Sequence, residues 1–215
     1  MTHPVIPLLP RSGEILDSIK GMFAAKGFDG ASMQDLARAA GMSAGNFYRY
    51  FPSKDAIVAA LVQRDLDEVQ REFTLIIQSP EPRATFLQVI RMRIETVDPD
   101  EGPIWAEIEA GAARRPELAA LLEAMVSSIT ASMVTVFARI AGIGEAEANA
   151  RYGAHARLFM MLIRGVSMET HCSVMRGHSA DPELAALVLS IIDRTLTEIA
   201  AGTSPTPVSS SERSA

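Results

Sequence analysis

Two short helix-forming runs meet at Gly41, and this junction constrains the fold more than any other feature of the 215 residues. Ser32 and Asp35 open the first run as an N-cap and a first-turn carboxylate, and Ser43 opens the second run as its N-cap. A glycine between two short helices permits the sharp turn that lays one helix across the other. The segment 32–54 therefore predicts a helix-turn-helix.

The spacing of side chains gives the second of these helices a buried face and an exposed face. Phe47 and Phe51 lie four residues apart, so we expect both to point inward. The outer face then carries small residues, a tyrosine and one arginine: Ala44, Gly45, Tyr48 and Arg49. A surface of this kind suits entry into the major groove of DNA, with Tyr48 and Lys54 within reach of phosphate oxygens.

Apolar residues recur at helical spacing almost from end to end, and glycine and proline separate the runs. The composition supports helices over sheet, because Ala, Leu, Ile and Met dominate while aromatic residues make up only 6%. Gly27 is expected to end the first helix, and Ser53 to cap the fourth. The pattern predicts an all-α fold with helices at about 12–26, 32–40, 43–51, 53–78, 83–97, 103–113, 116–141, 145–176 and 181–201.

The segment from residue 12 to about residue 60 closely resembles the TetR/AcrR helix-turn-helix signature, with a dozen positions in fixed register. The matching residues are Ser32, Leu36-Ala37, Ala40-Gly41, Ser43, Gly45, Phe47-Tyr48, Tyr50-Phe51, Ser53-Lys54-Asp55 and Ile57. Met42, Phe47 and Ser32 replace the family's usual Val, Leu and Thr and keep the role of each position. The resemblance implies a three-helix DNA-binding domain joined to a larger helical domain that dimerises and often holds a small-molecule effector.

The same resemblance implies roles for individual residues. Ser32, Met33 and Gln34 would meet the DNA backbone, and Ala44, Gly45, Asn46 and Arg49 would face bases. Tyr48, Tyr50 and Lys54 would face phosphates. Other interpretations stay open: Tyr48 as a half-buried surface aromatic, Lys54 as a solvated first-turn residue, and Asn46 or Arg49 as a contact to phosphate or water.

The net charge of −6 argues at first against a protein that binds nucleic acid. Residues 1–60, however, carry six Lys or Arg against five Asp or Glu, a net charge of +1 that leaves −7 for the rest. The acidic character therefore belongs to the C-terminal part, and the N-terminal segment can approach phosphates.

The chain is expected to divide into a flexible extension (1–11), a helix-turn-helix domain (12–60), an effector-binding and dimerisation domain (61–202) and a disordered tail (203–215). The N-terminal run is not expected to be a signal peptide, because it is short, broken by prolines and lacks a basic leader. We expect a cytoplasmic protein without a membrane partner.

Two apolar faces on each of the last two predicted helices favour a homodimer. One face would pack within the subunit and the other would join a partner's helices in a four-helix bundle, although burial of both faces within one subunit is the alternative. A two-fold axis also suits a palindromic operator.

A small, mostly apolar effector is expected in the C-terminal domain near Trp105, since methionine and aromatic side chains adapt to varied ligands. Ordinary core packing is the alternative for each candidate. Arg164 interrupts an apolar stretch, so it either pairs with an acid at an interface or turns into a cavity. The candidate contacts are Trp105, Met92, Glu107, Met133, Phe137, Phe159, Arg164 and Met168.

The sequence offers no base–nucleophile–acid set and no glycine-rich phosphate loop, so neither an enzyme nor a cofactor is predicted. His171, Cys172 and His178 invite a metal site, but adjacent helical residues point about 100° apart and cannot easily ligate together. The predicted function is a repressor that binds DNA as a dimer and is released by an effector. A regulator of the same fold without a small effector, as an activator or under a protein partner, is the alternative.

Overall fold

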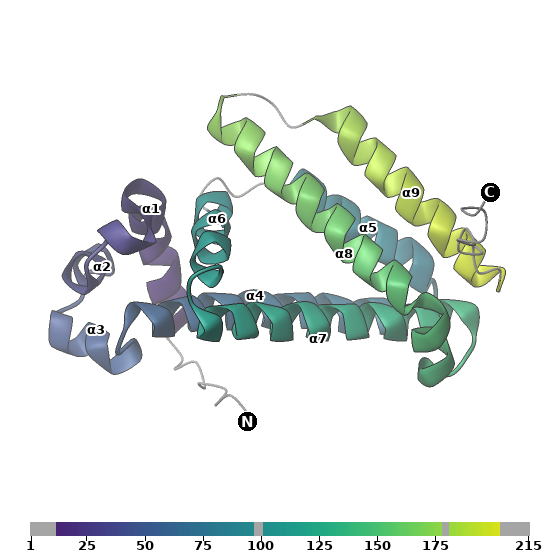
Figure 1. The fold of residues 1–215 in the computed structure, drawn as a ribbon, viewed down its shortest axis with the longest axis horizontal. Helices are drawn as coiled ribbons and strands as arrows, with labels where there is room; N and C mark the ends of the chain where they lie inside the picture. Colours follow the sequence, from purple (N-terminus) through teal and green to yellow (C-terminus); the bar gives the residue numbers. More distant parts are fainter. Residues whose placement is uncertain (1–11, 97–100, 178–180, 203–215) are drawn as a thin grey trace, which may run out of the picture. The chain divides into compact units, whose positions relative to one another are not determined.

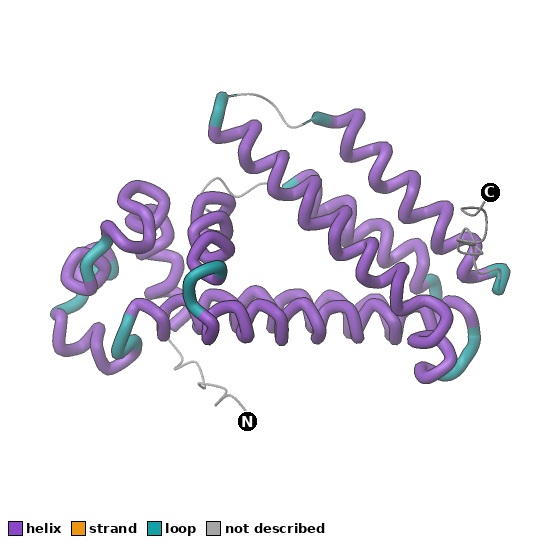
Figure 2. The backbone as a smooth tube through the Cα atoms, in the orientation of Figure 1, coloured by secondary structure: helices purple, strands orange, loops and turns teal. Residues whose placement is uncertain are grey.

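The computed structural model describes residues 12–96, 101–177 and 181–202, and these residues form helices joined by short loops with no strand (Figure 1, Figure 2). The predicted all-α fold is confirmed. The helices are α1 (Ser12–Gly30), α2 (Met33–Ala39), α3 (Ala44–Tyr50), α4 (Lys54–Gln78), α5 (Pro82–Glu95), α6 (Glu101–Ala112), α7 (Pro116–Ala141), α8 (Glu145–Met175) and α9 (Pro182–Ala200). The predicted extension (1–11), the predicted tail (203–215) and His178 lie outside the described residues.

The first helix departs from its predicted end. Gly27 interrupts the helix with a backbone at φ 68° and ψ 169°, as its glycine suggested, but the chain then makes a further turn to Gly30. Because glycine lacks a Cβ, it reaches this positive φ at little cost, and the helix can bend and resume. The helix end predicted at Gly27 is therefore a kink in the structure, and the helix ends at Gly30.

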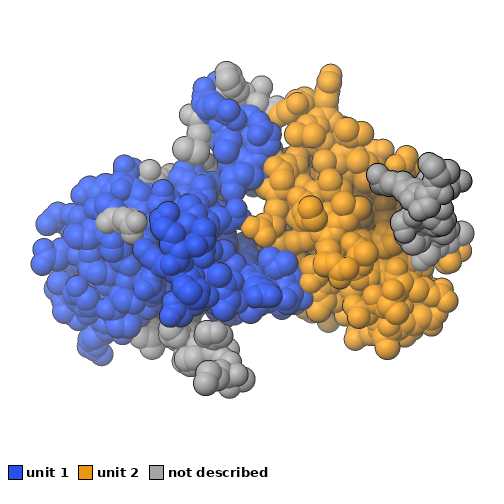
Figure 3. Space-filling view, in the orientation of Figure 1, with its two compact units in different colours: residues 1–70, 96–128, 168–180 blue, residues 71–95, 129–167, 181–215 orange. Residues whose placement is uncertain are grey.

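The chain divides into two compact units, which Figure 3 colours separately. Unit 1 comprises residues 1–70, 96–128 and 168–180, and unit 2 comprises residues 71–95, 129–167 and 181–215. The boundary predicted near residue 60 falls within unit 1, and the division into two domains at that point stays a prediction.

The described core of unit 1 gathers around the first four helices, and α6 packs against α1. Leu16 and Ile19 of α1, Leu36 of α2 and Phe47 of α3 have no exposed surface. These are apolar positions on the faces that helical spacing directs inward. Their mutual burial holds α1 against the two seven-residue helices α2 and α3, which would be marginal in isolation.

Aromatic rings form the centre of unit 2. Phe86 of α5, Phe137 of α7 and Phe159 of α8 are fully buried, and their ring centroids lie 5.5 to 6.4 Å apart. Phe73 of α4 extends the group at 6.4 Å from Phe86. Edge-to-face and tilted pairs of this kind add to the free energy gained from apolar burial.

One helix is long and apolar enough to be considered as a membrane span. α7 contains an 18-residue window of mean hydropathy 1.6, and 33% of that window is buried inside the structure. A single helix of this kind is weak evidence for a span among the described residues, because core helices of soluble proteins have the same length and composition.

Candidate nucleic-acid interface

The turn between α2 and α3 is fixed by hydrogen bonds at both helix ends. Ser32 caps α2, with its Oγ accepting from the Asp35 N–H at 3.1 Å while the Asp35 carboxylate accepts from the Ser32 N–H at 3.2 Å. At the other end, Gly41 adopts φ 63°, and the Met42 N–H donates to the Ala37 carbonyl at 2.9 Å. This glycine-dependent C-cap ends α2 sharply and sets the direction in which the chain re-enters a helix.

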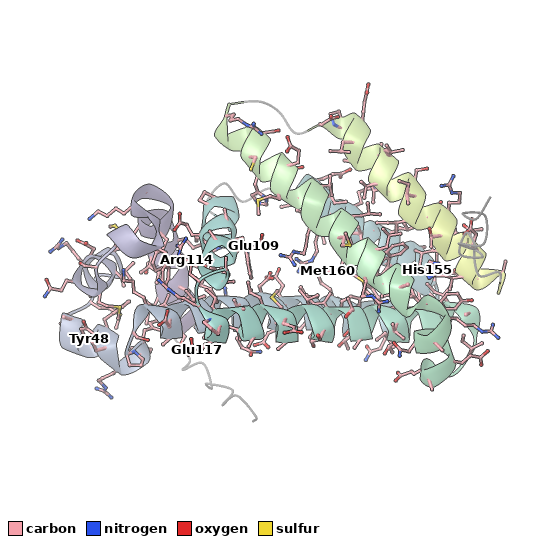
Figure 4. The ribbon with its side chains drawn as sticks, in the orientation of Figure 1. Tyr48, Glu109, Arg114, Glu117, His155 and Met160 are labelled. Carbon is pink, nitrogen blue, oxygen red and sulfur yellow. The ribbon has the colours of Figure 1, made fainter. Side chains whose placement is uncertain are left out.

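Helix α3 begins after Ser43, whose Oγ accepts from the Asn46 N–H at 3.4 Å. We call α3 the reading helix, because its outer face is predicted to meet the bases of DNA. Phe47 and Phe51 point inward with 0% and 2% of their surface exposed, whereas Tyr48 is 45% exposed (Figure 4). The predicted separation of faces is therefore present. Two phenylalanine anchors orient α3 so that its polar side chains lie on the surface.

The residues predicted to contact DNA come from the neighbouring helices α2, α3 and α4 of unit 1. Those that are exposed are Ser32, Gln34, Gly45, Asn46, Tyr48 and Arg49. Those that are half-buried are Met33, Ala44, Tyr50 and Lys54. Arg49 forms no ion pair with another described residue. The contacts themselves stay predictions.

The structure places the Lys54 side chain against Phe28 at the end of α1. Its Nζ donates a 2.9 Å hydrogen bond to the Phe28 carbonyl oxygen and sits 5.6 Å from the centroid of the Phe28 ring. The half-buried side chain is thus directed to the end of α1. Its assignment to a phosphate, made on the resemblance, stays a prediction.

Asp35 carries the most strongly perturbed carboxylate of this surface. Hydrogen bonds from the Ser32 hydroxyl, the Ser32 backbone and Lys26 lower its pKa from 3.8 to about 2. Lys26 and Arg38 lie 3.3 and 3.4 Å from its oxygens. The carboxylate therefore stays ionised near neutral pH and caps the start of α2. Lys26 and Arg38 partly neutralise its charge.

The segment from α1 into α4 is similar to known proteins. The family described as "Bacterial regulatory proteins, tetR family" matches residues 15–61, the segment that runs from α1 into α4. Over this segment the chain is similar to the family. The predicted resemblance is confirmed there, and with it the helix-turn-helix character of α2 and α3.

Individual regulators are similar to this chain in sequence or in fold. The HTH-type transcriptional repressor KstR2 of Rhodococcus jostii is 30% identical over 89 residues, which cover 41% of this chain and 44% of that relative's length. Among solved structures, Salmonella enterica GusR superposes with a TM-score of 0.66 at 22% identity, covering 93% of this chain and 100% of GusR. The regulator FadR of Bacillus subtilis, solved with stearoyl-CoA, gives 0.60 at 20% identity and covers 88% and 98% of the two chains. These two structures share the fold.

The residues predicted to line an effector site fall in both units of the protein. In unit 1, Trp105 and Met168 are half-buried, while Glu107 accepts a hydrogen bond from the Phe28 N–H at 3.3 Å. In unit 2, Phe137 and Phe159 have no exposed surface and belong to the aromatic core described above. Met133 is also buried, whereas Met92 and Arg164 are exposed. Their role in binding an effector stays a prediction.

Two polar groups of unit 2 were missed by the sequence analysis. Within the described residues nothing hydrogen-bonds the hydroxyl of Tyr152 or the Nδ1 of His155, and both atoms are buried. The two rings meet edge to face at 5.7 Å on α8, and Figure 4 marks His155. Burial lowers the pKa of His155, and the charge of Glu198 partly offsets that effect. A lone tyrosine in an alanine-rich stretch was the only signal in the sequence.

No cluster of three or more His, Cys, Asp or Glu side chains within the described residues has an arrangement that could hold a metal ion. Cys172 is half-buried on α8 beside His171, where helical geometry turns the two side chains in different directions.

Proposed function

We propose that this protein is a transcriptional repressor that binds a palindromic operator as a homodimer and acts in the cytoplasm. The observation that carries the proposal is the exposed face of α3, where Asn46, Tyr48 and Arg49 stand opposite two buried phenylalanines. A helix so oriented can enter the major groove, with amide and guanidinium groups at base edges and the tyrosine hydroxyl at a phosphate. The family match over residues 15–61 supports the same role.

The dimer is proposed from an apolar stripe on α8 and α9. Leu158 and Met161 of α8 are 44% and 72% exposed, and Leu187 of α9 is 57% exposed. On the same helices Phe159 and Val188 are buried, so each helix has an inner and an outer apolar face. A second copy that covers the outer faces with its own α8 and α9 would remove this apolar surface from water.

Selection from a random DNA library tests the proposal without knowledge of the target gene. The selected sequences should form an inverted repeat with half-sites about one helical turn apart, because the two reading helices are related by a two-fold axis. Affinity for the selected site should exceed that for its scrambled sequence and fall steeply with salt, as counterions are released from phosphates. Equal affinity for both DNAs at physiological salt would contradict the proposal.

We further propose that a small, mostly apolar effector releases the operator. Helix α4 runs without a break from Lys54 to Gln78, so a tilt at one end moves the other. A ligand acts only through its differential affinity for two states, and tenfold release requires about 1.4 kcal/mol of coupling. FadR, of the same fold, was solved in complex with stearoyl-CoA, which is therefore a reasonable first probe beside shorter apolar ligands.

Fluorescence of Trp105, the only tryptophan, reports on the proposed effector site. We expect one class of apolar ligand to change this fluorescence and to lower operator affinity in the same concentration range. A ligand panel that changes neither would remove the effector from the proposal. Operator binding would then remain as the proposed function, as in a regulator of the same fold without a small effector.

A further inference from the structure

Three charged side chains gather where α1 and α2 meet, and we call them the Asp35 triad: Lys26, Asp35 and Arg38. The Lys26 Nζ lies 3.3 Å from Asp35 Oδ2, and the Arg38 Nη1 lies 3.4 Å from Asp35 Oδ1. Each oxygen of one carboxylate thus faces a cation, one from α1 and one from α2. Because two cations share one anion, the triad keeps an excess of positive charge.

The triad presents its positive charges to the outside. The side chains of Arg38 and Lys26 are 78% and 47% exposed, whereas that of Asp35 is 22% exposed. The Asp35 carboxylate is held in place by Ser32, whose hydroxyl and backbone N–H donate to Oδ2 at 2.8 and 3.2 Å. An anion that approaches this surface therefore meets the two cations before it meets the carboxylate.

The triad adjoins two residues that are predicted to meet the DNA backbone. Lys26 and the Ser32 hydroxyl contact the same oxygen, Asp35 Oδ2, so the lysine lies beside Ser32. Arg38 follows the exposed Gln34 by four positions in α2, and residues four apart share a face of a helix. Both cations thus lie next to the side of α2 that is predicted to face DNA.

The ion pairs of the triad hold their cations loosely. Pairs between exposed side chains contribute little net stability, and distances of 3.3 and 3.4 Å are longer than those of close charge-assisted hydrogen bonds. Lys26 and Arg38 can therefore turn towards a phosphate at small cost and gain charge-assisted hydrogen bonds there. Until then the carboxylate keeps both cations at this surface, which reduces the entropy lost on binding.

We propose that Lys26 and Arg38 bind a phosphate of the operator backbone, and that Asp35 holds the two cations together in the DNA-free protein. The inference rests on the proposed operator binding and adds a lysine of α1 and an arginine of α2 to the DNA contacts predicted from the sequence. Phosphate contacts position a protein on DNA without reading its sequence. The two cations therefore contribute affinity and orientation, while the outer face of α3 selects the bases.

The salt dependence of binding tests each contact. A lysine or arginine that binds a phosphate contributes about one to the slope of log affinity against log salt. We expect Lys26→Met and Arg38→Met each to make this slope shallower by about one and to weaken operator and random DNA by the same factor. Arg91→Met is the matched control, because Arg91 is 61% exposed and pairs with Glu95 at 3.5 Å on a different helix, α5. Slopes for Lys26→Met and Arg38→Met equal to that of Arg91→Met would overturn the inference.

A conservative variant separates phosphate binding from a merely structural role. Lys26→Arg keeps the positive charge, so it should retain the slope of the unaltered protein. A triad that only stabilises the junction of α1 and α2 would lower the melting temperature of the methionine variants and weaken binding at an unchanged slope, which would also overturn the inference. Failure of the unaltered protein to bind any selected DNA would instead contradict the proposed function, and this inference with it.

Chemical labelling of the unaltered protein tests the contacts without a variant. Mass spectrometry can follow acetylation of Lys26 and the reaction of Arg38 and Arg91 with phenylglyoxal. We expect saturating operator DNA to slow the reactions of Lys26 and Arg38 and to leave that of Arg91 unchanged. Reaction of Lys26 and Arg38 at the same rates with and without bound operator would overturn the inference.

Discussion

Asp35 and Ser32 bind one another at the start of α2, and this pair shows how a single residue sets local stability. The Ser32 hydroxyl and backbone donate to the carboxylate, with Lys26 nearby, and together they lower the Asp35 pKa to about 2. A carboxyl group whose pKa is lower in the folded state stabilises that state above its unfolded pKa. The contribution is lost as pH falls through the folded value.

The pH dependence of unfolding should therefore reveal this pair. Asp35→Asn keeps the size of the side chain but removes its charge, so it should lower the melting temperature at neutral pH. The difference between the two proteins should shrink as pH falls from about 4 to about 2, because Asp35 becomes protonated in that window. Thermal unfolding followed by circular dichroism measures this difference, and a difference that stays constant down to about pH 2 would contradict the assignment.

Two exposed residues of α3 should affect DNA recognition in different ways. Asn46→Ala removes an amide suited to a base edge, so it should change the preference at one base pair by about 1–3 kcal/mol. Tyr48→Phe removes a hydroxyl suited to a phosphate and should weaken all sequences alike. Competition with single-base operator variants distinguishes the two, and unchanged preference ratios for Asn46→Ala would show that Asn46 does not read a base.

At the scale of helices, the kink in α1 depends on one glycine. Gly27 holds φ at 68° and ψ at 169°, a combination that residues with a Cβ rarely adopt. Space is not the constraint, since a Cβ there would lie 3.7 Å from the nearest Glu107 oxygen, an ordinary contact. The kink lies directly before Phe28, whose N–H donates to the Glu107 carboxylate at 3.3 Å.

Substitution of two glycines in the same helix tests this account. Gly27→Ala should lower the free energy of unfolding by about 1–3 kcal/mol because of backbone strain. Gly21→Ala is the matched control: Gly21 precedes the kink, and a methyl group added there would have no neighbour within 4 Å, so alanine should stabilise the helix by about 0.5–1 kcal/mol. Denaturant unfolding gives both values, and a shift of the same sign in both variants would contradict the explanation.

At the scale of the whole molecule, the proposed dimer decides whether two reading helices can bind one operator. Leu187→Glu places a charge in the outer stripe of α9 and should yield a monomer whose operator affinity falls sharply, because a single half-site remains. Leu75→Glu is the control, since Leu75 is 64% exposed on α4, outside the stripe, and should leave the dimer intact. Sedimentation at micromolar concentration measures the mass, and a dimeric Leu187→Glu protein would contradict the proposed interface.

The sequence by itself determined the helices and the resemblance to the family. Helical periodicity, N-capping serines and proline breaks are local signals, so α2, α3, α4 and α7 begin and end within a residue or so of their predicted positions. The inward orientation of Phe47 and Phe51 followed from the same periodicity. The signature at residues 32–57 then identified the DNA-binding family because its glycines, caps and aromatic anchors occupy fixed positions in the chain.

Only the tertiary structure decided where the long polar side chains are directed. Lys54 has several rotatable bonds and two possible partners, and its position in the sequence does not reveal that the end of α1, 26 residues earlier, offers a carbonyl. Glu107, expected at an effector, binds the backbone of the same turn. Phe137 and Phe159, expected beside a ligand, fill an aromatic core with Phe86. Contacts between distant segments depend on how the helices pack, and local sequence patterns carry no direct record of that packing.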